Sequence, residues 1–94
     1  MKIEEPWYII ESDFEKEKIK EELFKEINNK HILFNKNVVP FIKRYDTDDV
    51  IFKLENESFA LVHLTWSNKN EESSKIPFTE ISNDLDTIFV NFNE

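Results

Sequence analysis

Two histidines and one group of aspartates are the side chains of this sequence with the clearest capacity for chemistry. His31 and His63 are the only imidazoles in the chain, and Asp46, Asp48 and Asp49 fall within one short segment. Imidazole nitrogens and carboxylates together suit a zinc site or general acid–base catalysis. A three-histidine metal centre is excluded. A metal would need both histidines and these aspartates, and nothing in their spacing requires that they meet.

Each of these candidates also has an ordinary structural explanation, which the surrounding pattern favours. His63 lies in a predicted strand and fits a half-buried histidine bonded to a neighbour. His31 follows a predicted helix and fits an exposed loop residue or a cap at the helix C-terminus. Segment 46–49 lacks the Gly and terminal Glu of a calcium loop and fits a solvated turn. Thr65 and Ser67, which flank Trp66, are not part of a nucleophile elbow. The pattern favours a protein that is not an enzyme, and predicts no metal and no cofactor.

Composition excludes further classes of chemistry. The chain has no Cys, which rules out disulfides and thiolate metal sites, and no Gly, which rules out glycine-rich phosphate loops. Residues 1–6 are charged and do not resemble a signal peptide, and no apolar run approaches the ~20 residues that span a bilayer. We therefore expect a cytoplasmic protein. With 94 residues, of which 39% are hydrophobic, the chain is expected to fold as a single domain, 1–94.

The first half of the chain predicts a strand followed by a helix. Residues 7–10 are aromatic and β-branched, which is typical of a short strand. Ser12 and Glu15 form a capping box that starts a helix, and Asn28 and Asn29 are expected to end it in left-handed geometry. The predicted apolar stripe comprises Ile19, Leu23, Phe24 and Ile27, which leaves Glu21, Glu22, Lys25 and Glu26 on the other side.

Three strands are predicted in the middle of the chain. Residues 38–45 form the first, with Pro40 at an edge or near the strand start, and residues 50–55 form the second. A tight turn at 56–57, with Asn56 at positive φ, leads into a strand over 59–66. That last strand is apolar on both faces, so we expect it to be central. Its two faces carry Ala60, Val62, Leu64 and Trp66 on one side and Phe59, Leu61, His63 and Thr65 on the other.

The C-terminal segment predicts one more strand and a second helix. Residues 76–81 fit a short strand, and residues 85–92 fit an amphipathic helix capped by Ser82 or Asn83. The predicted fold is therefore α+β. An antiparallel meander sheet of three to five strands carries the N-terminal-region helix and the short C-terminal helix on one face.

Two neighbouring strands carry the residues of a resemblance. Residues 48–55 read DDVIFKLE and residues 60–67 read ALVHLTWS. The chain resembles a family of small, mostly uncharacterised bacterial cytoplasmic proteins with DDVxFxLE and VHLTWS strands, in which a Gly-His-Pro-Leu-like loop corresponds to the Lys-His-Ile-Leu of residues 30–33. The resemblance implies a shared fold over most of the chain and no particular activity. If that loop packs toward the two strands, the binding candidates that share one surface are His31, Asp48, Asp49, His63, Thr65 and Trp66.

Charge indicates the kind of partner. The formal net charge is −8, and the only basic segment is 30–45, with Lys30, Lys36, Lys43 and Arg44. An acidic domain repels phosphate backbones and anionic membranes, so we expect neither nucleic acid nor membrane binding. Negative charge steers association with basic proteins, although it also serves simply to keep a protein soluble.

These observations leave three hypotheses about function. The leading one is a small acidic protein-binding module, in one version an immunity-type inhibitor of a basic toxin such as a nuclease. The alternative is a small enzyme or ligand-binding domain that uses His63 with Asp48 and Asp49, and it predicts a concave pocket that reaches His63. The third is an accessory domain that forms a homodimer through an exposed face of the sheet.

Overall fold

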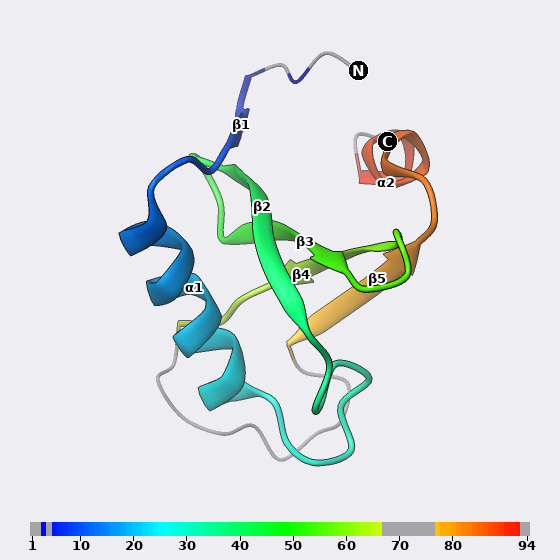
Figure 1. The fold of residues 1–94 in the computed structure, drawn as a ribbon. Coiled ribbons are helices and arrows are strands. Elements are labelled where there is room, and N and C mark those ends of the chain that lie inside the picture. The colour runs from blue at the N-terminus through cyan, green and yellow to red at the C-terminus, as the bar shows by residue number, and fades with distance from the viewer. Residues whose placement is uncertain (1–2, 4, 67–76, 93–94) are drawn as a thin grey trace.

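The described residues form one antiparallel sheet with two helices (Figure 1). The computed structural model describes residue 3, residues 5–66 and residues 77–92. The five strands lie side by side in chain order, β1-β2-β3-β4-β5, which confirms the predicted α+β meander. The elements are β1 (Trp7–Ile9), α1 (Asp13–Glu26), β2 (Val38–Arg44), β3 (Asp49–Leu54), β4 (Phe59–His63), β5 (Phe78–Ser82) and α2 (Leu85–Phe92).

The two helices cover opposite faces of the sheet, and the prediction that they share a face is wrong. In β3, Val50 and Phe52 join the core cluster that contains the buried residues of α1. Ile51 points the other way and packs in the cluster that contains Leu85 and Ile88 of α2. Because buried apolar side chains lie on both faces of β3, Val50 and Phe52 on one and Ile51 on the other, each face needs a cover. Burying one large aliphatic side chain is worth about 1.5–3 kcal/mol, so leaving either face bare would be costly.

The N-terminal cap of α1 is confirmed and its C-terminal cap differs. Ser12 Oγ accepts a hydrogen bond of 3.2 Å from the Glu15 backbone N–H, as a capping box requires. At the other end, Ile27 is extended (ψ 139°), and its own N–H donates to the Leu23 carbonyl. The helix therefore ends at Glu26, two residues before Asn28, and the expected left-handed asparagine cap is absent there.

The buried side of α1 is not the predicted one. Glu22 and Glu26 are 5% and 0% exposed, whereas Phe24 is 41% exposed. Together with Ile19 and Leu23, these glutamates form the side of the helix that faces the protein. The assignment of both glutamates to the solvent side is wrong, because the contacts that stabilise them come from a segment far along the chain.

The strands are found where strands were predicted, but the identity of the central strand and the end of β4 differ from the prediction. β3, rather than β4, is the central strand, and β4 ends at His63 instead of continuing to Trp66. Pro40 lies in β2 beside a register shift, where β1 does not reach, because β1 pairs only with residues 42–44. Its missing N–H therefore costs no pairing with β1.

Two turns use other residues than expected. In the turn between β3 and β4, Glu57 takes the positive φ of 62°, and Asn56 instead accepts a hydrogen bond of 3.3 Å from the Ser58 N–H. Before α2, Asp84 acts as the cap, since its Oδ1 accepts the Asp86 N–H at 3.0 Å. Among the described residues, no helix has the length and apolar character needed to cross a membrane.

Candidate functional site

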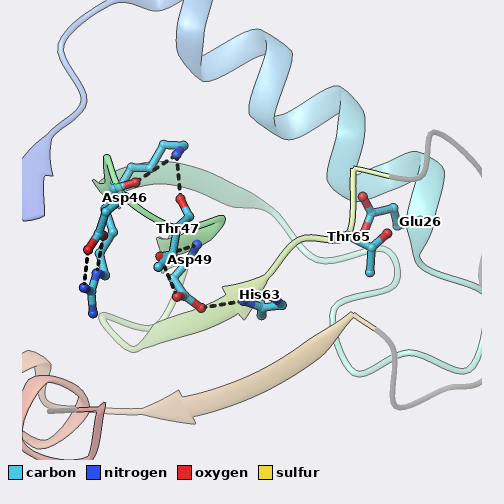
Figure 2. A network of polar contacts seen from close by, with 8 residues as sticks. Glu26, Asp46, Thr47, Asp49, His63 and Thr65 are labelled. Atoms are coloured by element: carbon cyan, nitrogen blue, oxygen red, sulfur yellow. Dashed lines mark hydrogen bonds and ion pairs between the residues drawn. The ribbon is translucent and has the colours of Figure 1, made fainter. Parts of the chain in front are cut away.

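An aspartate–histidine pair joins β3 to β4 at one end of the sheet (Figure 2). Asp49 and His63 are direct cross-strand partners, and His63 Nδ1 lies 2.9 Å from Asp49 Oδ1. The Asp49 side chain is only 7% exposed, while that of His63 is 55% exposed. An ionised carboxylate can only accept, so Nδ1 carries the proton of the neutral ring. The other ring nitrogen, Nε2, has no partner among the described residues and retains an open lone pair.

The turn between β2 and β3 holds Asp49 in place. Thr47 Oγ1 donates to Asp49 Oδ2 at 2.7 Å and accepts from the Asp49 N–H at 3.3 Å. Lys43 Nζ in turn donates to the Thr47 carbonyl at 3.1 Å and to the Arg44 carbonyl at 2.9 Å. Asp49 therefore uses both carboxylate oxygens. The orientation of the His63 ring follows from this arrangement, as in metal sites and catalytic dyads where a carboxylate orients an imidazole.

An ion pair between Arg44 and Asp46 neutralises part of the same turn. Arg44 Nε and Nη2 donate to the two oxygens of Asp46 at 2.8 and 2.7 Å, and the Arg44 guanidinium also lies 5.6 Å from the Trp7 ring centre. The Arg44 guanidinium lowers the pKa of the Asp46 carboxyl. Asp48, by contrast, is exposed.

A buried carboxylate fixes the chain just beyond β4. Glu26 Oε1 accepts the Thr65 N–H at 2.9 Å, and Glu26 Oε2 accepts the Trp66 N–H at 2.7 Å. Burial raises the pKa of Glu26 to about 7, helped by a hydrogen bond with Glu22, while the bonds from Thr65 and Trp66 act in the opposite direction. The signal that could have revealed this is the position of Glu22 and Glu26 at i+3 and i+7 from Ile19, on one face of the helix.

Five of the six predicted site residues lie on two adjoining segments. The Leu64 N–H donates to the Asp48 carbonyl at 3.2 Å, and Asp49 pairs with His63, so residues 48–49 lie beside residues 63–64. Trp66 follows the end of β4 with φ 54° and a side chain that is 43% exposed, so it is neither core nor part of a strand. We define the Trp66 surface as the exposed side chains of Asp48, His63, Thr65 and Trp66.

His31 is separate from this surface. It is 4% exposed, so the interpretation as an exposed loop residue is wrong. Its Nδ1 accepts the Leu33 N–H at 3.0 Å, and Nε2 donates to the Pro77 carbonyl at 3.0 Å, with Thr79 Oγ1 at 3.2 Å. Thr79 pairs with a β4 residue that faces α1, whereas His63 points to the opposite face. His31 therefore fixes the loop after α1 against the start of β5.

The three cavities described next lie away from His63. The described residues also contain no cluster of metal ligands. A cavity of about 590 Å³ is lined by Ile32, Leu54 and Ile81 among others, and two of about 370 and 180 Å³ adjoin α1. None of these three is lined by His63, so the pocket expected around it is not among them. Within residues 5–66 and 77–92, no group of three or more histidines and acids could hold a metal.

Comparison with known family models, with curated proteins and with solved structures finds no match for this chain. The resemblance carried by residues 48–55 and 60–67 therefore stays a prediction. Function is therefore inferred from the geometry of the site itself.

Proposed function

We propose that this chain is a cytoplasmic protein-binding module that engages a basic protein through the Trp66 surface. The observation that carries the proposal is the fixed, half-exposed Trp66. Its side chain remains 43% exposed while its backbone N–H is bound to the buried Glu26. A tryptophan presented on an anchored backbone loses little conformational freedom on binding, and tryptophan is enriched among the residues that dominate binding energy.

The charges around Trp66 favour a basic partner. Lys43 and Arg44 are occupied by carbonyls and by Asp46 within their own turn, so they offer little to an acidic partner. The Asp48 carboxylate is exposed, and the whole chain carries −8. Complementary charge speeds association and selects against acidic partners, and it makes binding sensitive to salt. The same net charge argues against nucleic acid as the partner.

An immunity-type inhibitor is the narrower version of this proposal. Such a protein neutralises a basic toxin, for example a nuclease, by covering its positively charged substrate groove. The acidity of the chain, with a net charge of −8, supports this version. Its test is direct: a captured basic nuclease should lose activity on addition of one equivalent of this protein and regain it when Trp66→Ala is used instead.

The test of the module uses matched variants in capture from a lysate of the organism that encodes it. The wild type, Trp66→Ala, Asp48→Asn and Phe14→Ala are each immobilised and compared at low and high salt. Phe14 is 73% exposed near the N-terminal end of α1, so its replacement removes an aromatic ring that is more exposed than Trp66 and lies away from the Trp66 surface. We expect one basic protein at low salt that is lost with Trp66→Ala, reduced with Asp48→Asn and kept with Phe14→Ala. Equal capture by all four proteins would refute the assignment of the surface.

The Asp49–His63 pair supports a second candidate function, a small enzyme or ligand-binding domain. The open Nε2 of a histidine oriented by a buried carboxylate is the group that such a site would use. Its weakness is that none of the three cavities reaches it. NMR of the His63 ring during additions of Zn²⁺ or small anions tests it. A response in the wild type that Asp49→Asn abolishes would favour this candidate over the binding module.

A homodimer has the least support. Both faces of the sheet are packed against a helix, so a dimer through a bare sheet face lacks the surface it requires. Sedimentation at high concentration that shows only monomer would exclude it.

A further inference from the structure

The cavity of about 590 Å³ lies at the opposite end of β4 from the Trp66 surface, between the loop after α1, the turn between β3 and β4, and β5. Its volume is in the range of roughly 300–1,000 Å³ that small-ligand sites occupy. Ile81 lies on the face of the sheet that α1 covers, because its cross-strand partner Ala60 belongs to the core cluster of that face. No residue of α1 lines the cavity, so the loop borders this end of the face in place of the helix. Among the described residues, the apolar lining consists of Ile32, Leu33, Leu54 and Ile81.

Hydrogen bonds fix both walls of this cavity. In the loop after α1, His31 Nδ1 accepts the Leu33 N–H at 3.0 Å. The other ring nitrogen of His31, Nε2, donates to the Pro77 carbonyl at 3.0 Å and so joins the loop to the start of β5. In the turn between β3 and β4, Asn56 Oδ1 accepts the Ser58 N–H at 3.3 Å. The walls are therefore in place before a ligand binds, which lowers the entropic cost of binding.

Two opposite charges line the same cavity. Lys36 and Glu55 are both among its lining residues, and both side chains are exposed. The structure describes both residues, and no ion pair joins them. Asn35 and Asn37 flank Lys36 in the lining and bring side-chain amides, which can donate as well as accept hydrogen bonds. A ligand that matches this lining has an apolar body, a negative group and a positive group.

We propose that this cavity binds an apolar zwitterion of the amino-acid type, supplied as a free amino acid or as a short peptide with free ends. The apolar side chains of the ligand pack on Leu33 and Leu54, its carboxylate meets Lys36, and its ammonium meets Glu55. A fatty acid satisfies Lys36 alone, and Glu55 repels its carboxylate. The site does not include Trp66, so it adds a second function that is independent of the protein-binding surface.

The test is ¹⁵N–¹H NMR of the full chain with four probes: leucyl-leucine, its N-acetyl form, its C-terminal amide, and free leucine. We expect leucyl-leucine to shift the backbone amides of residues 32–37 and 55–58, while those of Thr65 and Trp66 stay in place. Each blocked dipeptide has lost one charge and should bind about 3- to 5-fold more weakly, as expected for the loss of one solvent-exposed ion pair. Tighter binding of leucyl-leucine than of leucine assigns the site to peptides, and the reverse order assigns it to free amino acids.

Charge variants connect each end of the ligand with its partner. Lys36→Gln should weaken the binding of leucyl-leucine about 3- to 5-fold and leave that of the C-terminal amide unchanged, because this form has no carboxylate. Glu55→Gln should act in the same way on leucyl-leucine and its N-acetyl form. Lys30→Gln and Glu21→Gln remove exposed charges outside the cavity, so these matched controls should change neither affinity.

Three results would overturn the proposal. They are amides of residues 32–37 and 55–58 that no probe shifts, equal binding of the free and blocked dipeptides, and a loss of affinity in Lys30→Gln as large as that in Lys36→Gln. Because none of these measurements includes a protein partner, such a result leaves the binding module standing, and a failed capture leaves the zwitterion site standing.

Discussion

Replacement of Glu22 by Gln should make the protein more stable at alkaline pH, which is unusual for the loss of a buried, hydrogen-bonded side chain. In the wild type, the pKa of Glu26 rises from 4.5 to about 7 on folding. A group with a raised pKa contributes stability that is fully present below pH 4.5 and is lost as pH rises through about 7. Glu22→Gln removes the second carboxyl and with it one cause of that rise. The neutral amide still fills the site.

The size of this loss of stability with pH follows from the linkage between proton binding and folding. The change in the pKa of Glu26 corresponds to about 3 kcal/mol as an upper limit, at 1.36 kcal/mol for each pH unit. The Glu22–Glu26 pair lies at the C-terminal end of α1, beside the exposed Trp66, so solvent screens part of it. We expect the wild type to lose roughly 1–2 kcal/mol between pH 5 and 8.5 through this pair, and Glu22→Gln to recover about half of that loss.

Urea denaturation followed by circular dichroism at several pH values measures the effect. At pH 5 the wild type and Glu22→Gln should be about equally stable, and at pH 8.5 the variant should be more stable. Since the proteins are compared at each pH, contributions from unrelated titrating groups cancel. Glu21→Gln separates relief of the net charge of −8 from relief of the buried pair. If Glu21→Gln stabilised the protein as much as Glu22→Gln at pH 8.5, or if wild-type stability were flat over this range, the reasoning would be refuted.

Three further predictions concern the rest of the molecule. Asp49→Asn should lower the free energy of unfolding, measured by urea denaturation, by about 1–2 kcal/mol, because it weakens buried hydrogen bonds to Thr47 and His63. His63→Ala should lower it less, since that ring is largely exposed. Tyr8, whose pKa is raised to about 12 by burial and by its hydrogen bond to Glu15, should ionise near pH 12 in an absorbance titration, and stability should fall as pH rises from 10 toward 12. Leu61→Ala should lower the free energy of unfolding by about 2–4 kcal/mol, because Leu61 packs on the face of the sheet that α2 covers. A decrease below about 1 kcal/mol would contradict the placement of the two helices on opposite faces.

Local sequence signals predicted the elements well because they act over a few residues. Ser12 and Glu15 form a cap within a single turn, so the helix start could be read directly. The alternation of β3 and β4 likewise depends on the pleat of each strand and on nothing distant, and the meander follows from short connections between antiparallel neighbours. The turn at residues 56–57 was predicted, but not which residue takes the positive φ, because the Asn56 side chain is used in another hydrogen bond.

The site could be predicted only in part. The sequence placed Asp49 and His63 on neighbouring strands, but their pairing depends on register, since a shift of one residue would turn one of them to the other face. His31 was grouped with them on the expectation that its loop packs toward the two strands. Its contact with Pro77 spans 46 residues, and no local pattern encodes it.

The sequence by itself determined that two glutamates lie one helical turn apart, beside the apolar residues of α1. Only the tertiary structure decided that they are buried rather than solvated. The physical reason is that a carboxylate leaves water only where donors replace it. For Glu26 those donors are the N–H groups of residues 39 and 40 positions away, which the end of β4 brings to the helix.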